Sequence, residues 1–176
     1  MNTNELRKIL DEHKIYVESF GENGSKADLS CADLSGANLG SVNLTGANLS
    51  GADLSGAYLR NANLTCANLS CADLSCADLR YANLRNANLT FANLSGADLP
   101  DHTYVIMGEE YPITITNGEY LRAGCQNHSI EDWRKFTKHE IAVMDGKAAL
   151  KFYPRLLDIV DFYLGKGERP EWLSKE

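Results

Sequence analysis

The chain has 176 residues, and its 24 acidic side chains outnumber its 17 basic ones, which gives a net charge of −7. This balance argues against direct nucleic-acid binding by phosphate neutralisation and fits a partner whose surface is basic or mixed. The chain contains no long apolar run, and its first residues carry no apolar signal core. We therefore expect a protein that is neither exported nor inserted in a membrane.

Residues 1–25 are predicted to form a capping helix and a linker. Asn2 and Glu5 have the spacing of a capping box, and apolar residues recur at helical spacing over 6–17. His13 lies within this helix, and we interpret it as a partly buried structural residue. The helix is expected to cover one end of the element that follows.

From Ala27 onward a five-residue unit, Ala-(Asp/Asn)-Leu-x-x, repeats fifteen times without interruption. Its central Leu recurs from Leu29 through Leu99, and Ala stands two residues earlier in every unit except the one that has Val42. A fixed short period predicts a solenoid, in which each unit buries its apolar side against its neighbours. Because Ala and Leu are two residues apart, both are expected to face the interior.

The repeat also indicates a family. Runs such as GANLSGADLSGAYL and CANLSCADLSCADL follow the pattern A(D/N)LXX closely. On these residues, the segment 26–101 resembles the pentapeptide-repeat proteins, and the resemblance implies a right-handed, four-sided β-helix with four repeats per coil. We therefore expect an all-β solenoid core of about four coils, preceded by the capping helix and followed by an α+β extension of a hairpin and two helices.

Four repeats per coil place every twentieth residue in one column, on one of four faces. One face, here called the acidic face, carries a carboxylate in three successive coils and no base: Asp33, Asp53 and Asp73. The next, here called the tyrosine face, mixes aromatic and charged side chains: Tyr58, Arg60, Asp78, Arg80 and Tyr81. We predict that these residues bind a partner.

The five cysteines favour a reducing, cytoplasmic setting. Four of them share one position of the repeat: Cys31, Cys66, Cys71 and Cys76. On a four-sided coil Cys31 and Cys71 lie two coils apart, about 9–10 Å at the strand spacing and beyond disulfide reach. We therefore expect free thiols in the cytoplasm, and we predict no cofactor.

Residues 102–176 are predicted to form the α+β extension. A short strand is expected at 104–107, and a hairpin over 113–122 has the strongest short turn signal, Asn-Gly, at 117–118. A helix is then expected to begin at Ser129 and to end near Asp145-Gly146.

The last apolar segment, 147–164, is expected to be helical, with Pro154 kinking it or starting a fresh helix. Its apolar side chains cover more than one stripe, so it must pack on two sides. We predict that one side forms a homodimer interface through Leu156, Val160, Phe162 and Tyr163.

Cys125, His128 and Trp133 belong to a short run that resembles a GCxxHxxxxW tail of phage and prophage proteins, some of which carry pentapeptide repeats. The resemblance implies a phage or prophage origin, and Trp133 joins the predicted partner-binding residues. Cys125 and His128 also have the spacing of metal ligands, and His139 or His102 could assist them. Because no second ligand pair and no third catalytic residue can be argued, we predict neither a metal site nor an enzyme.

The predicted function is a non-catalytic protein-binding module: a phage- or prophage-type inhibitor or modulator of a bacterial nucleic-acid-handling complex, acting by steric occlusion or partial DNA mimicry. Gyrase, a nuclease or a CRISPR-type effector are candidate partners. The family resemblance implies a relation to proteins that protect or inhibit DNA gyrase, from which this chain departs in its short rod, mild charge and uninterrupted repeats.

Four alternatives stay open. The rod could be a scaffold whose C-terminal tail binds the partner, or the tail could bind metal or catalyse a reaction through Cys125 and His128. The Ser and Thr rows could order a surface. Finally, Asp and Asn could serve only as corner residues of the coil.

Overall fold

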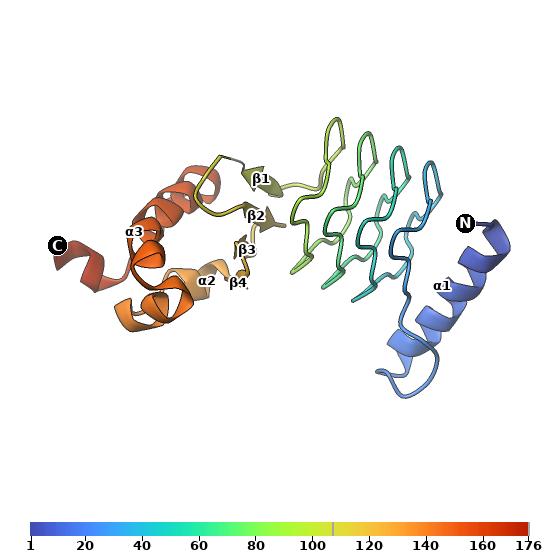
Figure 1. Ribbon diagram of the computed structural model, residues 1–176, viewed down its shortest axis with the longest axis horizontal. Coiled ribbons are helices and arrows are strands. Elements are labelled where there is room, and N and C mark those ends of the chain that lie inside the picture. The colour runs from blue at the N-terminus through green and yellow to red at the C-terminus, as the bar shows by residue number, and fades with distance from the viewer. Residues whose placement is uncertain (107, 176) are drawn as a thin grey trace. The chain divides into compact units, whose positions relative to one another are not determined.

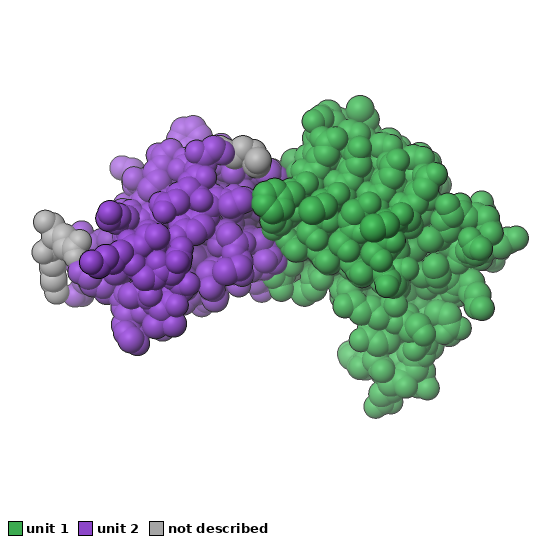
Figure 2. All heavy atoms as spheres, in the orientation of Figure 1, with its two compact units in different colours: residues 1–101 green, residues 102–176 purple. Residues whose placement is uncertain are grey.

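The computed structural model describes residues 1–106 and 108–175 (Figure 1). Its contacts divide the chain into two compact units, Met1–Asp101 and His102–Glu176, which Figure 2 shows in green and purple. Each unit has a hydrophobic core of its own. Among the described residues, no helix is both long enough and apolar enough to cross a bilayer.

The repeat of the first unit forms a four-sided β-helix, as predicted. Parallel bridges join residues twenty positions apart along the repeat, from Asp28 with Asn48 to Asp78 with Asp98. Each coil therefore holds four repeats, and Figure 1 shows the coils stacked on one another. The Leu and Ala side chains form a continuous core, in which every central Leu over 39–84 is fully buried.

Each corner of the coil is a four-residue turn that starts at a central Leu. In one of them the Ala32 N–H donates a hydrogen bond to the Leu29 carbonyl oxygen, and Cys31 at the third position has a φ of 54°. A positive φ at this position is typical of a type II turn, and Gly adopts it without strain. The repeat cysteines occupy this same position, and all five cysteines are free and exposed.

Helix α1 (Thr3–Glu18) covers the first coil. Its N-terminus has the predicted capping box: the Glu5 N–H donates to Asn2 Oδ1 at 2.9 Å, and the Asn2 N–H donates to Glu5 Oε2 at 3.3 Å. Three apolar residues of α1 pack against the Leu core: Leu6, Ile9 and Leu10. Because of this cover, Leu29 in the first repeat is as buried as the leucines in the middle of the rod.

His13 attaches α1 to the repeat and should make the cap sensitive to pH. Its ring is fully buried, and its Nδ1 accepts a hydrogen bond from the Ala27 N–H at 3.0 Å. Burial, assisted by the charge of Lys26, lowers the pKa of His13 below its usual 6.5. As the pH falls through 6.5 the unfolded chain takes up this proton before the folded protein does, so stability decreases.

We expect the urea midpoint of unfolding to fall between pH 7 and pH 5, and the His13→Asn variant to show a smaller fall. Asparagine can accept the Ala27 bond and does not titrate. Midpoints of both proteins at the two pH values measure this difference. If the urea midpoint fell by the same amount in both proteins, a role of His13 in the pH dependence would be contradicted.

The second unit contains a four-stranded antiparallel sheet in the order β1-β2-β3-β4. Its strands are β1 (Tyr104–Ile106), β2 (Ile113–Thr116), β3 (Tyr120–Ala123) and β4 (Gln126–Ser129). The predicted first strand and hairpin are present, although Met107 at the expected end of the strand lies outside the described residues. Strand β4 was not predicted, because its sequence Gln-Asn-His-Ser lacks the apolar alternation of a strand. It pairs with β3 from Tyr120 with Ser129 to Ala123 with Gln126.

The helices of this unit are α2 (Ile130–Trp133), α3 (Lys138–Leu164) and the 3-10 helix η1 (Glu171–Lys175). Ser129 caps α2 as expected, since its Oγ accepts a hydrogen bond from the Asp132 N–H. The single helix predicted from Ser129 to Asp145 is wrong. The chain leaves the helix after Trp133 and starts again at a second capping box, in which Thr137 pairs with Glu140.

Helix α3 is interrupted near its middle, but not at Pro154. The break lies at Asp145 (φ −156°, ψ 43°) and Gly146 (φ 55°, ψ −133°), where the sequence analysis placed a helix end. Helical dihedral angles continue through Pro154, so the predicted kink or fresh start there is wrong. The flanking Tyr153 and Leu156 are buried, and their packing holds this stretch helical.

Candidate functional site

The acidic face aligns three carboxylates in successive coils. Bridges join Asp33 to Asp53 and Asp53 to Asp73, so neighbouring carboxylates are about 4.8 Å apart along the rod. Each carboxylate accepts a hydrogen bond at Oδ1 from the backbone N–H two residues later, at 3.2, 2.9 and 2.9 Å. The bonds from Ser35 and Ser75 lower the pKa of Asp33 and of Asp73, which therefore remain ionised well below neutral pH.

Asparagine makes the same corner elsewhere in the rod. Asn43 Oδ1 accepts from the Thr45 N–H at 3.1 Å, and Asn63 Oδ1 accepts from the Thr65 N–H at 3.1 Å. The turn requires only an oxygen at this place, so the negative charge of the acidic face is separable from its structural role. An Asp→Asn substitution on this face is therefore expected to remove the charge and to keep the corner hydrogen bond.

The tyrosine face brings its aromatic and basic side chains together. The Tyr58 ring packs on the backbone of the preceding coil, where a Cβ added to Gly40 would lie 2.5 Å from its Cε1. The Arg60 guanidinium carbon lies 4.9 Å from the centroid of the Tyr81 ring, a cation–π contact. Tyr81 is nonetheless 66% exposed, so this pair is open to a partner.

Asp78 and Arg80 on the tyrosine face neutralise each other. Arg80 donates from Nε to Asp78 Oδ1 at 2.9 Å and from Nη2 to Oδ2 at 2.7 Å. The guanidinium lowers the pKa of Asp78 to about 2. The free negative charge of this part of the rod therefore lies mainly on the acidic face.

Three predicted contact residues of the second unit are not on its surface. Trp133 is 3% exposed, and its Nε1–H donates to the Leu121 carbonyl oxygen at 2.8 Å. Leu156 and Val160 are buried in the same core. They cannot contact a second protein without unfolding this unit, so these assignments are corrected. Phe162 is 82% exposed and Tyr163 is half-buried, so the predicted dimer contact stays a prediction for these two.

Cys125 and His128 belong to the turn before β4 and to β4 itself. Cys125 is exposed, whereas the His128 ring packs edge-on against Trp133 and Phe136, with centroids 5.3 and 4.9 Å apart. His128 Nε2 lies 3.4 Å from Gln126 Oε1. Over 1–106 and 108–175, no three His, Cys, Asp or Glu side chains are grouped to hold a metal ion.

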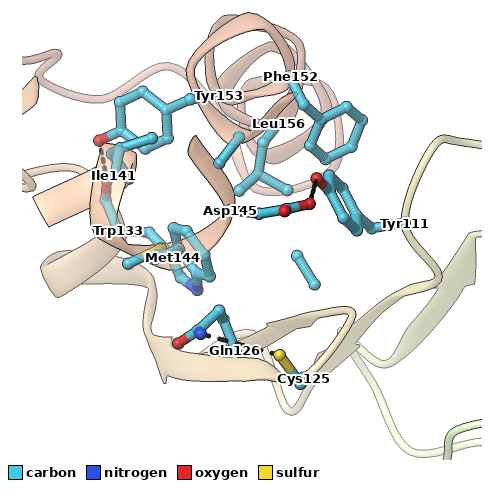
Figure 3. Close-up of a pocket in the computed structure, with 12 residues that line it drawn as sticks. Tyr111, Cys125, Gln126, Trp133, Ile141, Met144, Asp145, Phe152, Tyr153 and Leu156 are labelled. Carbon is cyan, nitrogen blue, oxygen red and sulfur yellow. Dashed lines mark hydrogen bonds between the residues drawn. The ribbon is translucent and has the colours of Figure 1, made fainter. Parts of the chain in front are cut away.

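Sequence reasoning missed a pocket in the second unit, which Figure 3 shows in close-up. It has a volume of about 220 Å³ and lies between the sheet, Trp133 and the two parts of α3. At one side the Tyr111 hydroxyl donates to Asp145 Oδ2 at 2.5 Å, and this bond raises the pKa of Tyr111 to about 12. The Asp-Gly pair at 145–146 was the available signal, since it marks the helix break beside the pocket.

Comparison with known proteins identifies the repeat. The family described as "Pentapeptide repeats" matches residues 27–65, 43–80 and 67–101, with eight copies. Among curated proteins, none matches the chain.

Similar solved structures are pentapeptide repeat proteins. One from the thylakoid lumen of Arabidopsis thaliana is 45% identical, with 42% of this chain and 50% of that chain covered and a TM-score of 0.41. Rfr23 from the cyanobacterium Cyanothece 51142 is 36% identical, with coverage of 42% and 54% and a TM-score of 0.36. HetL, involved in heterocyst differentiation regulation in Nostoc sp. strain PCC 7120, is 44% identical, with coverage of 42% and 37% and a TM-score of 0.32. The chain thus spans about half the length of these relatives or less.

Proposed function

Because this chain belongs to the pentapeptide-repeat family, we propose that it is a non-catalytic binding module whose acidic face docks on a basic surface of a protein partner. The observation that carries this proposal is the row of carboxylates at Asp33, Asp53 and Asp73. Their corner bonds use Oδ1 in each case, and the second oxygen of each carboxylate is left for a cation of the partner.

The three carboxylates of the acidic face are held in a fixed conformation in the free protein. These side chains are short and held by backbone N–H groups, so little conformational entropy is lost when a partner docks. Regular carboxylates on a narrow rod imitate part of the charge of a nucleic acid. A suitable partner is therefore a bacterial protein with a basic groove for nucleic acid, such as gyrase, a nuclease or a CRISPR-type effector. Its inhibition by occlusion would suit a phage or prophage protein.

The tyrosine face would add non-ionic contacts to the same interface. Successive repeats form adjoining sides of the coil, so Tyr58 and the Arg60–Tyr81 pair lie on the side next to the acidic face. Tyr and Arg are the residue types that most often dominate binding energy at protein interfaces. The acidic face would then direct the approach, while the tyrosine face slows dissociation.

The test is a variant with Asp33→Asn, Asp53→Asn and Asp73→Asn, used on a partner that the intact protein retains from nuclease-treated bacterial lysate. We expect its affinity to be at least about tenfold lower than that of the natural sequence at low salt, because three charge contacts with the partner are lost together. The affinity of the variant should also depend less on salt. Its far-UV circular dichroism should be unchanged, because asparagine keeps the corner bond.

A charge-matched control carries Asp11→Asn, Glu18→Gln and Glu22→Gln, three exposed positions outside the acidic face. This control should bind like the natural sequence. Equal affinity of all three proteins would reject the acidic face as the binding surface. Equal losses in both variants would show that only net charge matters.

A further inference from the structure

We propose that the pocket of the second unit binds a small, uncharged aromatic molecule with one hydrogen-bond donor, of the phenol or indole class. This site is separate from the faces of the rod and does not depend on the function proposed for them. The pocket is a defined space among side chains of β3, the turn before β4, α2 and α3. Figure 3 shows these side chains surrounding it.

The size and the walls of the pocket select an apolar ring. A dry cavity of about 150 Å³ is enough to bind benzene, and this pocket of about 220 Å³ has room for a substituted or fused ring. Its apolar walls are Ala123, Trp133, Ile141, Met144, Ala149, Phe152 and Leu156. Aromatic and thioether side chains favour an aromatic guest through edge-to-face and sulfur contacts.

Small side chains and the helix break create the space. Ala123 on the sheet and Ala149 on α3 both line the pocket, and neither side chain fills it. Between Met144 and Ala149 the helix departs from regular geometry at Asp145 and Gly146. The exposed Asp145 and Cys125 mark the mouth through which a ligand would enter.

The Asp145 carboxylate at the mouth selects the functional group of the ligand. Asp145 Oδ2 accepts the Tyr111 hydroxyl proton, whereas its Oδ1 is not part of that bond. A carboxylate can only accept hydrogen bonds, so the matching ligand brings an O–H or N–H donor. The same carboxylate repels an anionic ligand, and the apolar walls leave any charge unsolvated.

The test uses 4-fluorophenol as the probe, observed by ¹⁹F NMR with the full chain. We expect a dissociation constant of about 1 mM or tighter. The matched anion, 4-fluorobenzoate, should bind at least about tenfold more weakly, because its charge is repelled and desolvated. Ala149→Leu should fill the pocket and weaken 4-fluorophenol binding at least about tenfold. Ala148→Leu makes the same change one residue away, outside the lining, and should leave binding within about twofold.

Asp145→Asn provides a second variant at an exposed position, so folding is not at stake. It should reduce the preference for 4-fluorophenol over 4-fluorobenzoate, because the repelling charge is removed. The proposal is overturned if the natural sequence fails to bind 4-fluorophenol at millimolar concentration. It is equally overturned if both leucine variants bind alike, or if Asp145→Asn leaves the preference between the two probes unchanged.

Discussion

Replacement of Leu64 by Ala is expected to lower the free energy of unfolding of the first unit by about 3–5 kcal/mol. Leu64 lies in the middle of the rod, is fully buried, and belongs to a core made of Leu and Ala alone in this stretch. Removing its isobutyl group leaves a cavity that the coils cannot close, because backbone bonds such as Leu64 N–H to the Asn83 carbonyl fix their separation. Chemical denaturation followed by circular dichroism measures the loss.

Leu99→Ala is the matched control, since it makes the same change in the last repeat. Leu99 is only partly buried, so its truncation removes less buried apolar surface. We expect a loss of under about 2 kcal/mol. A solenoid whose repeats are supported only by their neighbours should show this difference between middle and end. Equal losses at Leu64 and Leu99 would contradict a core in which burial depth sets the cost.

The architecture of the rod could be predicted because its information is local and repeated. Fourteen of the fifteen repeats carry the same inward Ala and Leu, so misreading a single repeat would not change the predicted fold. The twenty-residue column follows from the four repeats per coil that the family resemblance implies, and it placed Asp33 beside Asp53 and Asp73 correctly. The columns do not predict the side-chain conformations within a face. The paired hydrogen bonds from Arg80 to Asp78 and the contact of Arg60 with the Tyr81 ring depend on side-chain rotamers, which the spacing of residues in the sequence does not specify.

The second unit was harder to predict because its structure depends on long-range packing. The polar strand β4 exists because β3 offers it a hydrogen-bonding edge, a tertiary effect that overrides local propensity. The apolar stripes of α3 were read as needing two packing partners, and one of these partners was assigned to a second protomer. Phe162 is exposed, whereas Leu156 and Val160 pack in one core with Trp133 and the sheet of the same chain. The pocket lies at this junction, which explains why it could not be foreseen.

Asp and Asn make the same corner hydrogen bond, but only Asp adds a negative charge. Both residue types supply the Oδ1 that accepts the N–H two residues later, so their shared use in the repeat requires no functional explanation. The choice of Asp at 33, 53 and 73, all on one face, is the part that turn geometry leaves unexplained. The triple asparagine variant separates these two contributions, because it changes the charge and retains the turn.

Trp133→Ala is expected to destabilise the second unit by about 3–5 kcal/mol while leaving the repeat folded. The indole contributes a buried ring against His128, Phe136 and Tyr153. It also donates a hydrogen bond to the Leu121 carbonyl oxygen at 2.8 Å, so alanine removes packing and a buried donor together. Hydrogen exchange read by mass spectrometry should show faster exchange over 113–164 and unchanged exchange over 27–99.

Trp172→Ala tests whether this effect depends on burial or on the loss of any tryptophan. Trp172 in η1 is half-buried, stacks on Tyr153 with centroids 5.6 Å apart, and donates to the Phe136 carbonyl oxygen at 3.0 Å. The two residues thus make similar kinds of contact at different depths, and we expect Trp172→Ala to cost less than half as much as Trp133→Ala. Faster exchange in the repeat of the Trp133 variant would contradict the independence of the two cores. Unchanged exchange over 113–164 in that variant would contradict the contribution of Trp133 to the stability of this core.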